Sequence, residues 1–407
     1  MKILFLAHRL PYPPDRGDRI RSWHVLKALA RKFDLHLGCF AESGDELQHL
    51  PVIDKLVASR CVPLRRKPLP LAGLQAIAES RSVSETAFDS GTLRHWGQET
   101  VRRERIDAIY VFSGQMGQFV PDDFRGRLLA DLVDVDSAKF EAYAAEKPGP
   151  RGWIDRREGR LLRAMEATMV ARADHTFLVS EAEAELLRSR CDGGPISALR
   201  NGIDTDEFDP DAVSAEDVFT GEGPHCVFTG QMDYRPNVDA VVRFARHALP
   251  AIQREFPSAR FHVVGRNPAP QVLALSDQGG CEVHGSVPDM RPYLAAADVV
   301  VAPLSLARGV QNKVLEAMAM ARPVVLTPEA ATGIGASDGL HFRVSSSHDA
   351  FAQDVIECVR NPADSARMGS AARQFVKDTL GWEAVLAGLP ALVRGYPRTH
   401  QDTRDAA

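Results

Sequence analysis

The stretch from residue 298 to residue 327 most constrains how this chain can fold. Two short apolar runs, Asp298–Pro303 and Pro323–Thr327, flank a helical pattern from Arg308 to Ala321. Neither run alternates between apolar and polar residues, which is typical of strands buried on both faces in a parallel sheet. Gly309 allows a flexible start of the helix, and Asn312 can cap it. The stretch therefore predicts a strand–helix–strand unit of an α/β domain.

Glu316 lies in the middle of this helix among apolar residues, where a carboxylate is unfavourable unless it has a partner. Two interpretations remain open. Lys313 lies one turn earlier and can form an internal ion pair with Glu316. Alternatively, the helix start binds a ligand, because its free N–H groups, Lys313 and Arg308 together offer the charge that a diphosphate needs. Gly309 and Val310 then belong to the same binding site, and Glu316 accepts hydrogen bonds from a ribose.

The segment from Arg308 to Thr327 resembles the donor-nucleotide motif of family 4-type retaining glycosyltransferases, the glycosyl transferases group 1, which have the GT-B fold. In that family two Glu residues, separated by seven residues, precede a small-residue helix and a "PVV" strand. The second Glu binds the donor ribose, and Glu316 matches it. Arg308 stands in place of the first Glu, so the chain departs from the family's contact to the donor sugar. The segment is most similar to exopolysaccharide sugar transferases associated with PEP-CTERM/exosortase systems.

The resemblance extends to a loop early in the second half of the chain. Phe228–Asn237 matches the place of the family's "GRL…K" motif, whose Arg and Lys hold the diphosphate. Here Gln231 and Pro236 occupy those two positions, so both cations are missing, and Arg235 is a candidate substitute. The resemblance also places Gly230 at the donor. We expect Arg308 to take over part of the missing charge, and Arg308 and Lys313 to stabilise the leaving diphosphate.

Two further segments are similar to the family. His284–Met290 resembles the "G.V.D" loop that meets the nucleobase, which assigns Val287 to the donor site. Leu199–Phe208 resembles the interdomain "NG(V/I)D…F" segment. Leu380–Val393 resembles the terminal helix that crosses back to the first domain. The resemblance thus covers most of the chain and is weakest between residues 60 and 125.

The N-terminus predicts a strand, a loop and a helix. Lys2–Ala7 is a buried-type strand, and the helix periodicity runs from Asp18 to Lys32. The loop between them lacks the GxGxxG pattern, which disfavours a nicotinamide dinucleotide site. The resemblance places Gly17 near the donor phosphates and the acceptor. An ordinary turn glycine is the alternative.

Three carboxylates lie at the carboxyl end of a predicted strand, at Asp131, Asp134 and Asp136. Carboxylate pairs suit a magnesium or manganese ion that carries a diphosphate. They can equally orient an acceptor hydroxyl or cap the helix that follows. The two-domain layout favours a site without metal, so we expect Asp134 and Asp136 to contact substrate. The stretch is close to the "DVDS" segment of the exopolysaccharide subgroup.

The remaining strand patterns define two α/β halves. The predicted domains are residues 1–205 and 206–377, followed by a terminal helix over 378–397 and a flexible tail over 398–407. The expected fold is GT-B, with two Rossmann-like doubly wound domains facing a cleft. The predicted strands are Asp34–Phe40, Ile106–Phe112, Arg127–Val133, His225–Thr229, Arg260–Val264, Cys281–His284, Asp298–Ala302, Pro323–Leu326 and Leu340–Val344.

Composition restricts the partners. Residues 1–200 carry a net charge of +3 and residues 201–407 a net charge of −8, and no concentrated basic stripe predicts nucleic acid. Six cysteines without metal-binding spacing favour free thiols in a reducing compartment, and the first residues do not read as a signal peptide. We therefore expect a cytoplasmic protein. The basic and apolar stretch Leu64–Ala78 fits either an anionic membrane surface or a packed loop and helix.

The resemblance implies a retaining, metal-independent hexosyltransferase that uses a nucleoside diphosphate sugar as donor and no cofactor. The acceptor is then a hydroxyl of a glycan or of a polyprenyl-linked molecule in exopolysaccharide biosynthesis. Two alternatives remain: a nucleotide-sugar 2-epimerase of the same fold, and an inactive binding or scaffold relative. The sequence names neither the sugar nor the base.

Overall fold

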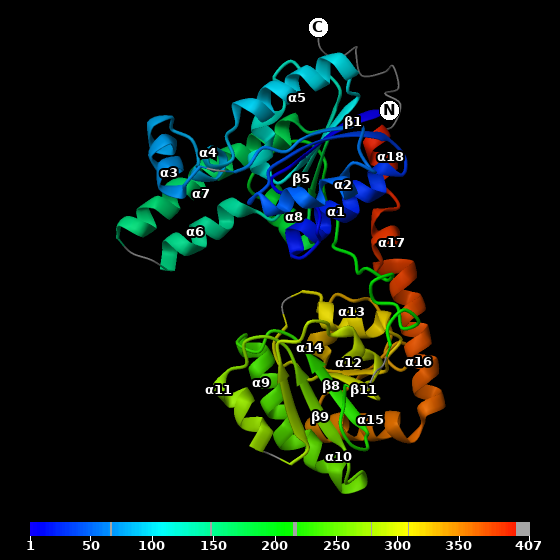
Figure 1. The fold of residues 1–407 in the computed structure, drawn as a ribbon. Helices are drawn as coiled ribbons and strands as arrows, with labels where there is room; N and C mark the ends of the chain where they lie inside the picture. Colours follow the sequence, from blue (N-terminus) through cyan, green and yellow to red (C-terminus); the bar gives the residue numbers. More distant parts are fainter. Residues whose placement is uncertain (66, 147–148, 215–217, 278, 308, 396–407) are drawn as a thin grey trace. The chain divides into compact units, whose positions relative to one another are not determined.

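The computed structural model describes residues 1–65, 67–146, 149–214, 218–277, 279–307 and 309–395. The chain divides into two compact units. Unit 1 comprises Met1–Asn201 and the chain from Val385 onward, and unit 2 comprises Gly202–Ala384 (Figure 1). The predicted boundary at residue 205 thus lies slightly beyond the observed division.

Unit 1 is built on a seven-stranded parallel sheet of order β3-β2-β1-β4-β5-β6-β7. The central strands are buried along nearly their whole length because they are continuous apolar runs, such as AIYVF in β4. The strands are β1 (Lys2–Ala7), β2 (Asp34–Cys39), β3 (Ser59–Cys61), β4 (Ala108–Phe112), β5 (Arg127–Val133), β6 (His175–Leu178) and β7 (Ile196–Ala198).

Nine α-helices accompany this sheet in the described part of unit 1. They are α1 (Gly17–Ala30), α2 (Leu50–Ile53), α3 (Leu69–Ala78), α4 (Val83–Ala87), α5 (Gly91–Glu104), α6 (Asp136–Glu146), α7 (Pro150–Arg172), α8 (Glu181–Arg188) and α18 (Leu389–Arg394). The hydroxyl of Ser180 caps α8 by accepting from the backbone N–H of Glu183.

Unit 2 repeats the same topology in a six-stranded parallel sheet of order β10-β9-β8-β11-β12-β13. In both sheets the first strand lies third from one edge, and the chain crosses to the other side of that strand after the third strand. The strands are β8 (His225–Thr229), β9 (Arg260–Val264), β10 (Cys281–Gly285), β11 (Val299–Ala302), β12 (Val324–Leu326) and β13 (Arg343–Val344).

The helices of unit 2 pack around one continuous apolar core formed with these strands. Helix α10 packs against α15, and α13 packs against α16. The helices are α9 (Arg235–Arg243), α10 (Leu249–Glu255), α11 (Pro270–Leu273), α12 (Arg291–Ala295), α13 (Asn312–Ala319), α14 (Pro328–Ala331), α15 (His348–Arg360) and α16 (Pro362–Phe375), followed by α17 (Trp382–Leu386), whose end passes into unit 1.

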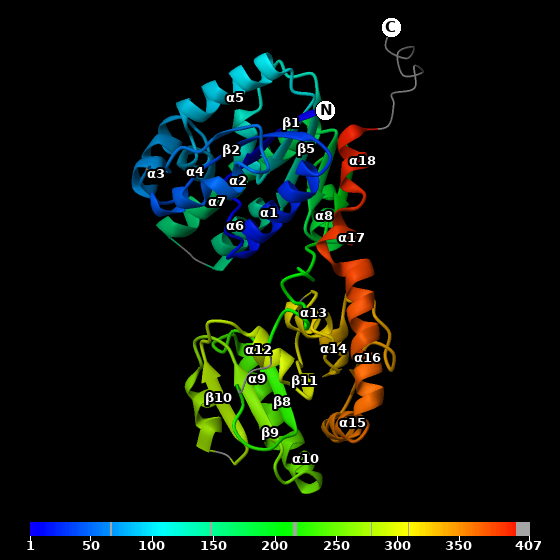
Figure 2. The same ribbon diagram turned by 45° about the vertical axis from the view of Figure 1, so that its right-hand side comes forward.

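The end of the chain differs from the single terminal helix that the sequence predicts. After α16 it forms a π-helical turn (Val376–Leu380) and then α17 and α18, which are separated at Gly388. Helix α18 packs against α1 and β5 of unit 1 (Figure 2). The predicted tail over 398–407 lies outside the described residues.

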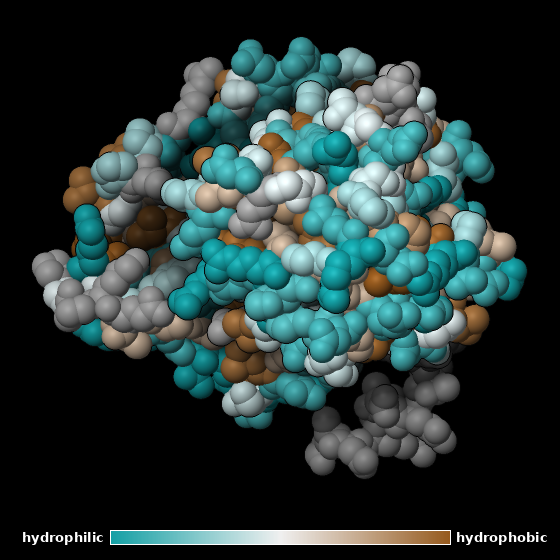
Figure 3. Space-filling model, turned by 90° about the horizontal axis from the view of Figure 1, so that it is seen from below, coloured by the Kyte–Doolittle hydropathy of each residue, from teal (hydrophilic) through white to brown (hydrophobic). Residues whose placement is uncertain are grey.

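Helix α3 presents two different faces. Ala72 and Ala76 are fully buried, whereas Leu71, Leu74 and Ile77 are 56%, 69% and 57% exposed. The stretch is therefore a packed helix that also carries an apolar outer surface. On the face of the molecule drawn in Figure 3, hydrophilic side chains predominate and apolar ones form small separate groups. None of the helices in the described ranges has both the length and the apolar character of a membrane span.

Candidate functional site

The candidate site of unit 2 lies where the loops after β8, β9 and β10 are joined by backbone hydrogen bonds. The N–H of Gly230 donates to the carbonyl of Val264 at 3.0 Å, and the N–H of Gly265 donates to that of Gly285 at 2.9 Å. A β-carbon on Gly265 would lie 1.6 Å from the carbonyl oxygen of Gly230, so only glycine fits there. The centre of the sheet, between β8 and β11, is the topological switch point at which open α/β sheets bind ligands.

Lys313, in the first turn of α13, points to this place. Its ammonium donates a 2.6 Å hydrogen bond to Oδ1 of Asn237 at the start of α9, and it lies 4.2 Å from the ring centroid of Phe228. Asn237 is buried, and its amide donates to the carbonyl of Gln231 at 2.8 Å. A β-carbon on Gly230 would come within 3.0 Å of both Asn237 and Lys313. The missing side chain at Gly230 therefore keeps open the space beside the ammonium.

Sequence reasoning did not single out Asn237 as a functional residue. Its only local signal is its position just inside a helix that begins with Arg-Pro, which does not reveal a contact with a residue 76 positions later. The contact depends on tertiary packing, which brings α9 and α13 to the same end of the sheet. Asn237 orients the cation on which the site depends.

Glu316 does not form the internal ion pair that the sequence left open. No hydrogen bond or ion pair joins Lys313 to Glu316 among the described residues, and the Lys313 ammonium donates to Asn237 instead. Burial raises the pKa of Glu316 to about 7, although the charge of Lys313 opposes that shift. Burial lowers the pKa of Lys313 to about 8, and here the charge of Glu316 opposes the shift. The two groups share an environment that disfavours both charges in the absence of a ligand.

The residues before α13 are only partly described. Gly309 has a left-handed backbone with φ of 70°, and a β-carbon there would meet no other atom. Val310 is partly buried and packs against the core of unit 2. Arg308 lies outside the described residues, so the role predicted for it remains a prediction. Asn312 does not cap α13, because Gln311 is the N-cap residue and makes no side-chain capping bond.

The cations near Gln231 differ from those expected. The guanidinium of Arg235 is 91% exposed and pairs weakly with Asp239 at 3.6 Å, so the structure does not direct it toward Lys313. Arg266 instead donates a 3.3 Å hydrogen bond to Oε1 of Gln231, the residue at the family's Arg position. Arg266 follows β9, where sequence reasoning did not look for a substitute. Val287 lies between β10 and α12 and packs partly against the core.

In unit 1, Gly17 is the first residue of α1 and is exposed, with open space around it. Next to it lies a group of charged side chains at the carboxyl end of β1. Asp18 accepts from Arg9 and lies 3.0 Å from Nε2 of His8, and these contacts together outweigh the effect of burial and hold its pKa well below the usual range. His8 is buried and stacks on Phe112. Sequence reasoning missed this group, although His8 and Arg9 directly follow the first strand.

The three carboxylates at the carboxyl end of β5 have partners within the chain: Asp131 binds Arg21, and Asp134 and Asp136 share Lys139. Asp131 is fully buried and binds Arg21 with two 3.0 Å contacts, while Tyr110 donates to it at 2.9 Å. Arg21 in turn donates to the carbonyl of Leu199 and to Asn201. Asp131 therefore anchors the end of unit 1 and is not available to a substrate.

Asp134 and Asp136 both accept from the ammonium of Lys139, at 2.8 and 3.2 Å. Burial lowers the pKa of Lys139, but hydrogen bonds to the two carboxylates and their charges outweigh that effect and raise it overall. Asp136 also begins α6. Lys139 thus offsets one of their two negative charges, and both carboxylates remain partly open to solvent.

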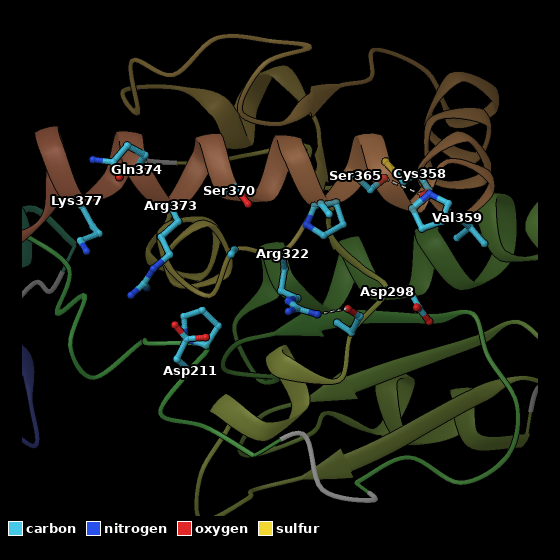
Figure 4. A pocket seen from close by; sticks show the side chains of 16 residues that line it. Asp211, Asp298, Arg322, Cys358, Val359, Ser365, Ser370, Arg373, Gln374 and Lys377 are labelled. Carbon is cyan, nitrogen blue, oxygen red and sulfur yellow. Dashed lines mark hydrogen bonds between the residues drawn. The ribbon is translucent and has the colours of Figure 1, made fainter.

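A separate pocket of about 580 Å³ lies between α16 and the segment that follows α13 (Figure 4). Arg322, Arg373 and Lys377 line it, together with Asp211 and Asp298. None of its described lining residues belongs to the predicted donor site. The guanidinium of Arg373 binds the carbonyl of Phe208 at 2.8 Å and the carboxylate of Asp209 at 3.0 Å, so it holds the chain after Gly202 in place. We assign this pocket a structural role in unit 2.

Part of unit 2 is similar to a known protein family. Residues 223–361 match the family described as glycosyl transferases group 1. A GDP-mannose-dependent alpha-(1-6)-phosphatidylinositol monomannoside mannosyltransferase of Mycobacterium tuberculosis is 26% identical over 243 residues, which cover 54% of this chain and 61% of the relative. The chain thus spans about three fifths of the length of the curated relatives it matches.

Solved structures with a similar fold include sucrose-phosphate synthase from Thermosynechococcus elongatus, at a TM-score of 0.58, 16% identity, and coverage of 97% of this chain and 98% of that one. HepE of Anabaena in complex with UDP has a TM-score of 0.60 and 14% identity, and the two chains are covered to 97% and 100%. At such identities the likeness shows the fold alone. The predicted GT-B fold class, with two Rossmann-like parallel-sheet domains, is confirmed.

Proposed function

We propose that this protein is a retaining glycosyltransferase that moves a sugar from a nucleoside diphosphate sugar to a hydroxyl of a glycan or lipid-linked acceptor. The observation that carries the proposal is the Lys313 ammonium, held by Asn237 at the carboxyl end of β8 beside the side-chain-free Gly230. A cation in a partly desolvated place, with no carboxylate bound to it among the described residues, suits a bound phosphate. The match of residues 223–361 to the glycosyl transferases group 1 supports the same assignment.

In the proposed complex the diphosphate contacts Lys313, Arg308 and the free N–H groups at the start of α13. The backbone of Gly309 and Val310 lines this part of the site, and Val287 belongs to the binding site of the nucleobase. Glu316 accepts hydrogen bonds from the ribose hydroxyls. Negative charge develops on the diphosphate as the glycosidic bond breaks, and positioned cations stabilise it most at that point.

Retention of the anomeric configuration follows, in this proposal, from attack by the acceptor on the face that the diphosphate leaves. In this proposal Glu316 binds the ribose, and no carboxylate among the described residues of unit 2 acts as a nucleophile. The departing phosphate takes the proton of the acceptor hydroxyl. The proposal includes no catalytic metal, since Lys313 and Arg308 supply the positive charge.

The proposed setting is exopolysaccharide biosynthesis in the cytoplasm, with an acceptor carried at the inner face of the membrane. It rests on the resemblance of the donor segment to the exosortase-associated subgroup. The exposed apolar residues of α3 offer a surface for peripheral contact with such a membrane. Asp134 and Asp136 are proposed to orient the acceptor, with Lys139 released from one of them on binding.

Calorimetric titration with nucleoside diphosphates, followed by a transfer assay with the matching sugar donor, tests this function. Lys313→Met should abolish binding of the diphosphate that binds best, whereas Arg235→Gln, which removes an exposed cation of the same unit, should leave it unchanged. UDP and GDP belong in the panel because relatives are named for each.

Nuclear magnetic resonance of the first-formed product then reports its anomeric configuration. An inverted product would refute retention, and an epimerised nucleotide sugar formed without any acceptor would favour the epimerase alternative. Equal diphosphate affinity in wild type and Lys313→Met would overturn the assigned donor site.

A further inference from the structure

Three histidines form a row across the neighbouring strands β8, β9 and β10 of unit 2. Nδ1 of His225 lies 2.9 Å from Nε2 of His262, and Nδ1 of His262 lies 3.0 Å from Nε2 of His284. Glu282 precedes His284 by two residues, so both side chains stand on the same face of β10. Oε2 of Glu282 lies 3.6 Å from Nδ1 of His262 and 4.0 Å from Nε2 of His284.

The surroundings leave this group covered on one side and accessible on the other. His262 is fully buried, whereas the side chains of Glu282 and His284 are 27% and 16% exposed. The ring of Phe219 stacks on His262 with centroids 3.9 Å apart, and Tyr293 packs edge-on against His284. The partial exposure of Glu282 and His284 gives an ion access to the group, while the ring of Phe219 covers His262.

We propose that Nδ1 of His262, Nε2 of His284 and Oε2 of Glu282 bind a divalent transition-metal ion of the zinc type. Ligand atoms of a tetrahedral zinc site, with bonds of about 2.0–2.1 Å, lie about 3.3 Å from one another. The three separations here range from 3.0 to 4.0 Å, so small side-chain adjustments suffice. Two imidazoles and one carboxylate suit zinc, copper or nickel better than magnesium or calcium. A water molecule would complete the coordination.

Two neighbours orient the proposed ligands. His225 can accept a hydrogen bond from the Nε2–H of His262, which leaves the lone pair of Nδ1 free for the metal. Arg260 donates to Oε1 of Glu282 at 3.0 Å and so directs Oε2 toward the imidazoles.

The proposed metal has a structural role that is separate from the sugar transfer. It would join β9 to β10, which is the edge strand of the sheet. The loop that contains Val287 leaves β10 after Gly285, the residue next to His284. A metal-free chain of hydrogen-bonded imidazoles, in which His284 donates to His262, is the alternative, and it predicts no metal affinity.

The test uses the full chain without a histidine tag, stripped with a chelator and dialysed. We expect it to bind one equivalent of Zn²⁺ in calorimetric titration and to melt at a higher temperature with Zn²⁺ but not with Mg²⁺. Co²⁺ should bind in competition with Zn²⁺ and give the visible absorption of a tetrahedral nitrogen and oxygen site.

Glu282→Gln and His284→Gln remove partly exposed ligands, so both variants should fold, and each should weaken Zn²⁺ binding about tenfold or more. His348→Gln is the matched control, because it removes an exposed histidine of the same unit that stacks on His247. Absence of stoichiometric binding in wild type would overturn the proposal. Equal affinity in wild type and His284→Gln would also overturn it and would assign the binding to other histidines.

Discussion

The ammonium of Lys313 donates to the amide oxygen of Asn237, although Glu316 lies one turn further along the same helix. Asn237 is neutral, so it orients the cation without neutralising it. The positive charge therefore stays available to a ligand, while burial lowers the pKa of Lys313 to about 8. This arrangement makes the charge state of the site depend on pH close to neutrality.

The affinity for a nucleoside diphosphate should pass through a maximum between about pH 7 and pH 8. Above the pKa of Lys313, about 8, the free protein loses the cation that binds phosphate. Below the pKa of Glu316, about 7, the carboxylate is protonated and becomes a poorer acceptor for ribose hydroxyls. Calorimetric titration at pH values below and above the maximum measures both decreases in affinity. Both decreases belong to the coupled pair of Lys313 and Glu316.

Lys313→Arg is the informative variant for the alkaline limb, because a guanidinium stays charged at all these pH values. Its affinity should no longer fall above pH 8. If the affinity of Lys313→Arg still falls at the same alkaline pH as that of the wild type, another group titrates there.

Glu316→Gln should weaken donor binding and stabilise the ligand-free protein above pH 7. The pKa of Glu316 is raised from 4.5 in the unfolded chain to about 7, so the folded protein holds this proton more tightly. Stability is therefore lost as pH rises from 4.5 to 7, by about 3 kcal/mol at most, and the glutamine removes that loss. Urea unfolding at several pH values measures the difference, which should vanish near pH 4.5.

Glu329→Gln provides the comparison, because Glu329 is an exposed glutamate of the same unit. It should change neither the donor affinity nor the pH dependence of unfolding. Unchanged donor affinity in Glu316→Gln would remove Glu316 from the ribose site.

Arg308→Ala should lower kcat/KM by about one to two powers of ten, because a charge-assisted hydrogen bond contributes about 1.5–3 kcal/mol. Arg308 takes the place of two missing family cations in this prediction, and Arg266, next to Gln231, is the second candidate. Arg266→Ala should therefore also reduce diphosphate affinity, whereas the exposed Arg235→Ala should not. Titration with the free nucleoside diphosphate separates binding from turnover.

The same titration decides between two roles of Arg308. If Arg308→Ala binds the free diphosphate as tightly as wild type but no longer binds the sugar donor, Arg308 recognises the sugar. A carboxylate on an acidic donor sugar, such as a uronic acid, would then be its partner.

Turnover should survive removal of divalent ions by a chelator. Lys139 already pairs with both Asp134 and Asp136, and the donor site supplies its own cations. Loss of turnover that Mg²⁺ or Mn²⁺ restores would make these aspartates candidate metal ligands. His284→Gln serves as the background control, because any effect that comes from the proposed zinc site should already be present in that variant.

Charged substitutions on α3 should weaken binding to vesicles that contain anionic lipids. Leu71→Asp and Leu74→Asp place carboxylates on its exposed apolar face, which would contact the bilayer in our proposal. Leu273→Asp alters a similarly exposed leucine of unit 2 and is the control. Cosedimentation measures the bound fraction, and equal binding by all three variants would exclude α3 as the contact.

Sequence patterns predicted the strands of both sheets where these are long and apolar. β1, β5, β8 and β9 have the bounds that their sequence patterns indicate. β3 and β7 were missed because they are three-residue strands that are only half-buried, so they carry no hydrophobic run. Their position at the two edges of the sheet explains that weaker signal.

The site was predictable where local sequence determines it and not where packing does. The helix with Lys313 and Glu316 follows from its flanking strands, but the hydrogen bond to Asn237 depends on two helices that meet across the sheet. The open choice between an ion pair and a ligand site could be decided only once that contact was known. The histidine row likewise has no local pattern, because its members come from three separate strands.

The close approach of Gly265 to the backbone of Gly230 has a consequence for how this protein can evolve. Position 265 is closed to every other amino acid by the 1.6 Å approach of a β-carbon, whichever nucleotide the protein uses. Asn237 and Lys313 are linked less strictly, because the amide of Asn237 orients the ammonium but does not fill its space. Natural variants should therefore keep a glycine at 265 and tolerate more change at 237.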